Sequence, residues 1–139
     1  MTETARGLAE QVRYRVGHLR QYLAAADDSI LGDQTRLYAV EFAFVLAAQA
    51  LLDLAGHACA TRGLSTDGSY RGALEVLAAE KLLEPALAEK IAGLPGSRNL
   101  LVHLYGKIDH ARALADIRGG LDSLEEAARR LVAAVDAVS

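Results

Sequence analysis

The residues best suited to chemistry lie close together in the segment Ser97–Asp109. On a helix, at about 100° per residue, Arg98, Asn99, His103 and Tyr105 fall on one polar face, and the leucines of the segment fall on the opposite, apolar face. A solvated helix needs a polar face, but it does not need these four residue types on it. On spacing alone an ordinary solvated face is the more common explanation, so the pattern identifies candidates without establishing catalysis.

These candidates fit the cleavage of a phosphodiester. A guanidinium such as that of Arg98 can hold a phosphate through two parallel hydrogen bonds and stabilise charge that develops in the transition state. An imidazole such as that of His103 titrates near neutral pH and can move a proton between a ribose 2′-hydroxyl and a leaving 5′-oxygen. Asn99, one helical turn before His103, is placed to orient the imidazole or the phosphate. The scheme requires no metal ion and no cofactor.

The rest of the chain predicts an all-helical domain that positions this segment. Hydrophobic residues make up 52% of the chain and charged residues 24%, which is a globular composition, and alanine, leucine, glutamate and arginine favour helix. The 139 residues suit a single domain with one core, spanning 1–139. Apolar residues at helical spacing predict five or six helices, over roughly 4–26, 34–61, 70–81, 84–92, from 98 onward, and 110–137.

Two segments of the predicted helical domain allow more specific predictions. Residues 27–33 are expected to form a connector, in which Asp33 caps the helix that follows. The pair Gly119-Gly120 lies inside the last predicted helix and predicts a bend or a weak point there.

The second predicted helix is apolar nearly all round. Between Leu37 and Leu52 only Tyr38, Glu41 and Gln49 carry polar groups. Such a helix must be buried on more than one side. In a domain this small one side can face the core, and we expect another to face a second subunit in a symmetric dimer.

Composition also bears on the cellular compartment. The single cysteine, Cys59, excludes an internal disulfide, and we interpret it as a buried, inert thiol. The longest apolar run, Phe42–Leu52, is too short to span a bilayer. Met1–Arg6 carries charges of both signs with no apolar stretch after it, so no signal peptide is expected. We therefore expect a cytoplasmic protein without a membrane segment.

The net charge of −3 argues against broad, tight binding of nucleic acid. It is compatible with an RNA substrate, because a local basic cleft can act within an acidic protein. We interpret the arginines of the first helix as a solvated surface, and two of the histidines as surface residues; these are Arg6, Arg13, Arg15, Arg20, His18 and His110.

Asp53 and His57 lie four residues apart and so share a helix face, which is a spacing that metal sites use. No third or fourth ligand is close in the sequence, so we predict no metal site. We expect Asp53 instead to orient a backbone or side-chain donor near the functional segment.

The motif Arg98-x4-His103-x-Tyr105 matches the R-x4-H-x-Y signature of HepT-like proteins in the HEPN superfamily. The resemblance extends over roughly residues 34–135, in which further matching segments follow the family's order and approximate spacing. These segments are Thr35-Arg36, Gln49–His57, Arg98-Asn99 and Tyr105-x3-Asp109. The chain departs from the family at Leu104, which is often polar in such proteins and here belongs to the apolar face.

The resemblance implies an all-α, up-and-down helical bundle of the HEPN type with about five helices, forming a homodimer. It implies a metal-independent endoribonuclease that leaves a 2′,3′-cyclic phosphate and acts as the toxin of a HepT/MntA pair. Arg98 and His103 would be catalytic, and Asn99 and Asp53 would support them. The expected partner is an MntA-like nucleotidyltransferase antitoxin that transfers AMP to Tyr105. The alternative is an inactive HEPN module that only binds such a partner, although the presence of both Arg98 and His103 argues against it.

Overall fold

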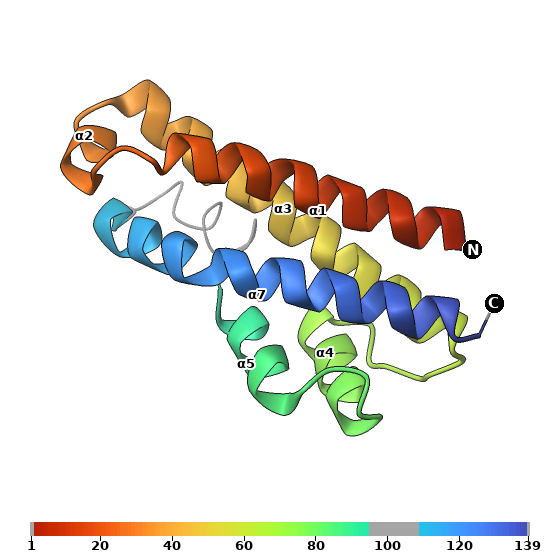
Figure 1. Cartoon of the computed structure of the whole chain (residues 1–139). Coiled ribbons are helices and arrows are strands. Elements are labelled where there is room, and N and C mark those ends of the chain that lie inside the picture. Colours follow the sequence, from red (N-terminus) through yellow and green to blue (C-terminus); the bar gives the residue numbers. More distant parts are fainter. Residues whose placement is uncertain (1, 95–108, 139) are drawn as a thin grey trace.

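Three long helices form the centre of the molecule (Figure 1). The computed structural model describes residues 2–94 and 109–138. The long helices pack against one another, and three shorter helices cover their ends and one side; the bounds are α1 Thr2–Tyr22, α2 Asp27–Leu31, α3 Gln34–Thr61, α4 Tyr70–Ala79, α5 Pro85–Gly93 and α7 His110–Asp136. The described ranges contain six helices and no strand, so the prediction of an all-helical bundle is confirmed.

The long helices do not all run the same way. Arg6 near the start of α1 lies 3.6 Å from a carboxylate oxygen of Asp136 at the end of α7, so these two helices are antiparallel. Arg62, which caps the end of α3, donates a hydrogen bond to the carbonyl oxygen of Ala134 near the end of α7, at 2.9 Å. The helices α3 and α7 therefore run in the same direction, as Figure 1 shows.

Local sequence explains where several helices begin. The side chain of Asp33 accepts a hydrogen bond from the backbone N–H of Arg36 at 3.2 Å, so the predicted cap of α3 is confirmed. Ser69 caps α4 in the same way, accepting from the N–H of Gly72 at 2.9 Å. Pro85 occupies the first turn of α5, where its missing N–H costs nothing.

The segment predicted to be a connector contains the short helix α2. Ile30, within that helix, is fully buried, and α2 contacts both α3 and α7. Burial of Ile30, together with the hydrogen bond that Nε of Arg118 donates to Asp27 at 2.6 Å, holds the segment against the core. Helical periodicity cannot reveal so short an element, because five residues show less than two turns.

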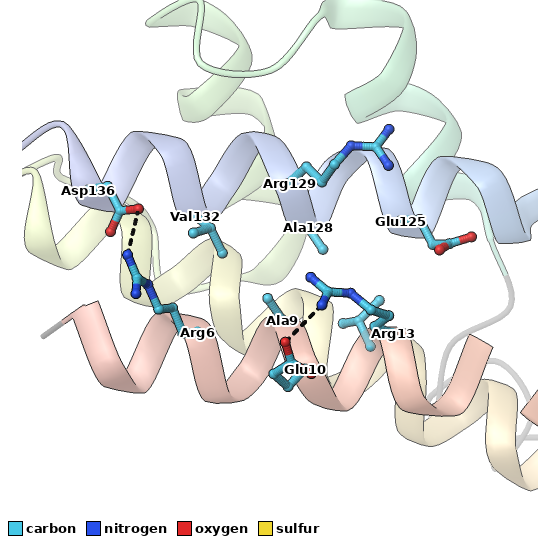
Figure 2. Close-up of a pocket in the computed structure, with 10 residues that line it drawn as sticks. Arg6, Ala9, Glu10, Arg13, Glu125, Ala128, Arg129, Val132 and Asp136 are labelled. Carbon is cyan, nitrogen blue, oxygen red and sulfur yellow. Dashed lines mark hydrogen bonds and ion pairs between the residues drawn. The ribbon is translucent and has the colours of Figure 1, made fainter. Parts of the chain in front are cut away.

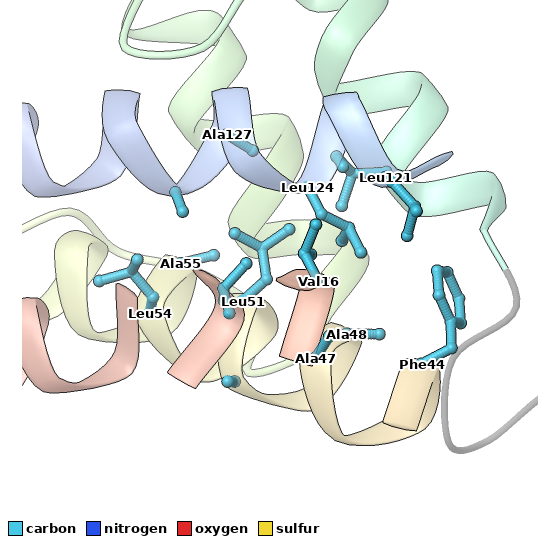
Figure 3. Packing of buried hydrophobic residues seen from close by; sticks show 14 of the residues in the cluster. Val16, Phe44, Ala47, Ala48, Leu51, Leu54, Ala55, Leu121, Leu124 and Ala127 are labelled. Atoms are coloured by element: carbon cyan, nitrogen blue, oxygen red, sulfur yellow. The ribbon is translucent and has the colours of Figure 1, made fainter. Parts of the chain in front are cut away.

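The core is assembled from the apolar stripes of the long helices (Figure 3). The stripe predicted on α3, from Leu37 through Phe44 and Leu51 to Leu54, is buried throughout. Side chains of α1 such as Val16 and of α7 pack against it, as Figure 3 shows for Leu121, Leu124 and Ala127. Burial of a leucine or phenylalanine contributes about 1.5–3 kcal/mol relative to exposure, so this packing is the main source of stability.

The opposite side of α3 leaves aromatic side chains in solvent. Tyr38 is 52% exposed and Phe42 is 63% exposed, while Val45 and Leu46 beside them are half-buried. By length and composition α3 could cross a membrane, but 61% of its most apolar window is buried inside the molecule. A core helix passes the same test, so this is weak evidence for a membrane span.

The helix α7 continues through Gly119 and Gly120 without interruption. Gly120 is buried, and a Cβ atom at that position would lie 2.6 Å from a terminal carbon of Leu94. The absence of a side chain therefore lets the end of α5 approach α7 closely. At Gly119, a Cβ atom would have no atom of the described residues within 4 Å, apart from its own stretch of helix.

Candidate functional site

Of the five residues assigned to the site from sequence, the structure describes one, Asp53. The motif residues Arg98, Asn99, His103 and Tyr105 lie outside the described residues, and their roles stay predictions. Polar contacts among the described residues lie on α3, at the start of α4 and at the start of α7.

Asp53 is exposed on α3, where its carboxylate belongs to a small polar cluster with Gln49 and Tyr70. It accepts a hydrogen bond from Nε2 of Gln49 at 2.9 Å and from the hydroxyl of Tyr70 at 3.2 Å. The same amide nitrogen donates to the Tyr70 hydroxyl at 2.7 Å. These contacts agree with the expectation that Asp53 orients side-chain donors, and its role beside the motif stays a prediction.

The turn before α4 places Tyr70 in this cluster. Oδ1 of Asp67 accepts hydrogen bonds from the hydroxyl of Ser69 at 2.6 Å and from its N–H at 2.9 Å. The side-chain hydrogen bond from Ser69 lowers the pKa of Asp67, and the backbone hydrogen bond adds to the effect. Ser69 in turn caps α4, which makes Tyr70 the first residue of that helix. Sequence reasoning did not identify Tyr70, because its partner Asp53 is distant in sequence and no periodic pattern links them.

His57 makes a local contact on the same helix. Its Nε2 lies 3.5 Å from the hydroxyl oxygen of Thr61, one turn further along α3. In the part of the chain that the structure describes, no group of three or more histidine, cysteine, aspartate or glutamate side chains could hold a metal ion. Asp53 is engaged by Gln49 and Tyr70 instead.

The start of α7 holds a part-buried polar pair that sequence reasoning also missed. Nδ1 of His110 lies 2.6 Å from Oε2 of Glu41, whose residue is only 8% exposed. The prediction that His110 is a surface residue is corrected, because its side chain is 32% exposed and reaches inward to α3. Asp109 caps α7 by accepting from the N–H of Arg112 at 3.1 Å, which fixes the position of His110. The isolated glutamate on the apolar helix was the available signal, since a buried carboxylate needs a partner.

A groove of about 520 Å³ lies elsewhere, between α1 and α7 (Figure 2). Its floor is formed by small apolar residues such as Ala9, Ala128 and Val132, and its rims carry three arginines and three carboxylates. Figure 2 shows Arg6 directed toward Asp136 and Glu10 directed toward Arg13, pairs in which nitrogen and oxygen lie 3.6 Å and 2.9 Å apart. Asp53 does not line the groove. Because its charges largely neutralise one another, we assign it no ligand.

A comparison with models of known protein families shows the family to which the chain belongs. The model of the ribonuclease HepT-like family matches residues 14–131, which is most of the chain and includes the whole predicted motif. The chain belongs to the HepT-like family. This HepT-like chain is therefore a member of the family that its R-x4-H-x-Y motif predicts. The comparison with curated protein sequences gives no significant match.

Solved structures of toxin–antitoxin complexes share the fold of this HepT-like chain. A tri-AMPylated HEPN toxin of Shewanella oneidensis, in complex with an MNT antitoxin, matches with a TM-score of 0.82 at 18% identity, covering 99% of both chains. A toxin–antitoxin complex with AMP-PNP matches with a TM-score of 0.81 at 19% identity, covering 94% of this chain and 99% of the other. A mutant complex containing MntA matches with a TM-score of 0.77 at 18% identity, covering 96% and 98%. At these identities the likeness establishes the HEPN fold.

Proposed function

We propose that this chain is the toxin of a HepT/MntA-type toxin–antitoxin pair and a metal-independent endoribonuclease. The observation that carries the proposal is the family match over residues 14–131, which contains Arg98, His103 and Tyr105 at the spacing of the family signature. The fold shared with a HEPN toxin over 99% of both chains supports it. We further propose that the protein acts in the cytoplasm as a single domain.

The chemistry follows from the two catalytic candidates. His103 takes the proton from a ribose 2′-hydroxyl, whose oxygen attacks the neighbouring phosphorus, and the bond from phosphorus to the 5′-oxygen breaks. A proton returns to the leaving 5′-oxygen, and the upstream product ends in a 2′,3′-cyclic phosphate. Arg98 stabilises the negative charge that builds on the phosphoryl oxygens. Asn99 and Asp53 are proposed to support this arrangement, Asp53 through the donors that it holds.

Regulation is proposed to act through Tyr105. An MntA-like nucleotidyltransferase would transfer AMP to its hydroxyl, as the AMPylated state of the S. oneidensis toxin suggests by analogy. On the helix that the sequence predicts from residue 98 onward, Tyr105 would share a face with Arg98. A bulky anion attached there would compete for the guanidinium and repel the RNA backbone.

The proposed active form is a homodimer. The solvent-facing side of α3 carries Tyr38 and Phe42, with half-buried Val45 and Leu46 between the aromatic side chains and the core. An apolar, aromatic surface of this kind is typical of the buried centre of a subunit interface. In such a symmetric dimer, the family resemblance leads us to expect that the two copies of the motif share one cleft.

The test measures cleavage of a labelled RNA by the purified chain in the presence of EDTA. Cleavage is expected for the natural sequence, with cyclic phosphate ends that block ligation until they are removed enzymatically. His103→Ala and Arg98→Ala are each expected to lower the rate by at least about 10²-fold. Arg71→Ala serves as the matched control, because Arg71 is exposed on α4 and only loosely paired with Glu89 at 3.8 Å. Cleavage that survives both motif substitutions refutes the proposal.

A second measurement addresses the antitoxin. After co-expression with an MntA-like nucleotidyltransferase, the peptide containing Tyr105 should gain the mass of one or more AMP units. Tyr105→Phe lacks the acceptor hydroxyl and should remain unmodified. A tight complex with the nucleotidyltransferase but no RNA cleavage under any condition would instead identify an inactive binding module.

A further inference from the structure

The exposed face of α1 carries a row of aromatic rings that the proposed function has not used. Tyr14, His18 and Tyr22 are spaced one helical turn apart, which places them in line along the helix. The Tyr14 and His18 rings meet edge to face with centroids 4.4 Å apart, and the His18 and Tyr22 rings are nearly parallel with centroids 6.3 Å apart. Tyr14 is 60% exposed and Tyr22 is 37% exposed, so solvent reaches ring surface at both ends of the row.

The guanidinium group of Arg15 lies beside this aromatic row. The guanidinium carbon of Arg15 lies 5.4 Å from the centroid of the Tyr14 ring. Within residues 2–94 and 109–138, Arg15 takes part in no ion pair, whereas Arg13 is paired with Glu10 at 2.9 Å and Arg20 with Asp122 at 2.9 Å. The positive charge of Arg15 is therefore not balanced by a carboxylate in the described part of the chain.

Several of the remaining charges of α1 are engaged by other side chains; Glu10, which lies one turn before Tyr14 in line with the row, is paired with Arg13. Arg13 and Glu10 line the groove against α7, and Arg20 is turned to α7 by Glu125 and Asp122, whose hydrogen bonds raise its pKa. The helix as a whole carries four arginines and two glutamates, which makes it more basic than a chain with a net charge of −3. The aromatic row thus combines exposed rings with an available cation on the basic helix of an acidic protein.

We propose that Tyr14, Arg15, His18 and Tyr22 form a stacking surface for unpaired bases of single-stranded RNA. Aromatic rings stack on nucleobases of any sequence, and a guanidinium beside them can stack on a base or contact a phosphate. This surface rests on the proposed ribonuclease function, for which it would hold part of the substrate strand on α1.

The composition of the face favours RNA over an apolar protein partner. The large hydrophobic residues exposed on the described part of α1 are the two tyrosines, and exposed aliphatic side chains are lacking there. Gln11 and Gln21, which are exposed and polar, share the solvent side of the helix. The centre of a protein interface would need a contiguous apolar patch, which α1 does not provide.

Stacking also predicts which form of RNA binds. The bases of a duplex are already stacked and paired, and their faces are not accessible to side chains. The surface should therefore prefer single-stranded to double-stranded RNA. Attraction to phosphates alone would not produce this preference, since both forms carry phosphates.

The experiment measures the affinity of the full chain for a fluorescein-labelled, unstructured RNA oligonucleotide by fluorescence anisotropy at one fixed salt concentration. All proteins carry His103→Ala, so that the probe is not consumed. Tyr14→Ala and Tyr22→Ala should each weaken binding about fivefold, and their combination about tenfold or more. Tyr14→Phe keeps the ring and should bind like the parent. Arg15→Ala should weaken binding a few-fold, and the matched control Arg13→Ala should not. Circular dichroism establishes that each variant folds.

Three results would overturn the inference. The first is an unchanged affinity in the double tyrosine variant, and the second is equal affinity of the parent for single-stranded and double-stranded probes. The third is loss of binding to a nucleotidyltransferase antitoxin with RNA affinity intact, which would make the row a protein interface. The experiment measures binding, so it can separate this inference from the proposed nuclease function. If the chain never cleaves RNA but the Tyr14 and Tyr22 variants bind RNA more weakly, the stacking surface is supported and the nuclease function is refuted. If the natural chain cleaves RNA and the tyrosine variants bind RNA unchanged, only the stacking surface is refuted.

Discussion

The pair formed by Glu41 and His110 connects α3 to the first turn of α7, and we predict that it contributes measurably to stability. Nδ1 of His110 lies 2.6 Å from Oε2 of Glu41. Glu41 is 8% exposed, and the side chain of His110 is 32% exposed. A hydrogen bond to a charged group contributes about 1.5–3 kcal/mol, and partial exposure of the imidazole reduces the expected coupling to about 1–2 kcal/mol. His110→Ala alone should cost about 2–3 kcal/mol, because it leaves a buried carboxylate without this partner.

A double-mutant cycle with Glu41→Ala and His110→Ala isolates this coupling. The free energy of unfolding is measured for each protein by urea denaturation at one protein concentration, since the stability of a dimer depends on concentration. Arg71 and Glu89 provide a matched control cycle, because their ion pair is 3.8 Å long and both side chains are largely exposed. The control coupling should stay below about 0.5 kcal/mol. If the Glu41–His110 coupling is no larger than the control, the pair does not hold α7 against α3.

Three further predictions concern the packing of α3 and α7. Phe42→Glu places a charge on the exposed face of α3 and should convert the proposed dimer to a monomer. Light scattering after gel filtration measures the mass, and an unchanged mass would exclude this face as the dimer interface. Burial raises the pKa of the Cys59 thiol, so the native protein should react with a thiol reagent at pH 8 far more slowly than the unfolded chain, and equal rates would contradict its burial. Gly119→Ala should stabilise the protein by up to about 1 kcal/mol in thermal unfolding through helix propensity alone. Gly120→Ala should be less favourable than Gly119→Ala by about 1–3 kcal/mol, because its methyl group meets Leu94, and equal effects would mean that Leu94 moves aside freely.

Local patterns in the sequence predicted most of the helical framework. The buried stripe of α3, from Leu37 to Leu54, follows helical spacing, and hydrophobic burial imposes that spacing on any core helix. The cap at Asp33 was equally predictable, because a capping side chain and the backbone N–H that donates to it are three residues apart. The short helix α2 was missed because one turn leaves no periodic signal, and the burial of Ile30 depends on distant helices.

Two contacts among the described residues could not be predicted from local sequence patterns. Tyr70 reaches Asp53 across 17 positions of sequence, and His110 reaches Glu41 across 69. Each contact depends on how two helices are placed relative to each other, which no local pattern records. The motif itself could be recognised because its residues lie within one short segment, and their arrangement in space stays a prediction.

The antiparallel packing of α1 on α7 has a practical consequence for labelling. Arg6 and Asp136 lie together, so the outer ends of the two helices form one pole of the bundle (Figure 1). His110 begins α7 at the opposite pole, about 39 Å from Asp136 at a rise of 1.5 Å per residue. A fluorophore or fusion partner attached beside Arg6 or Asp136 should therefore leave the pole at His110 uncovered.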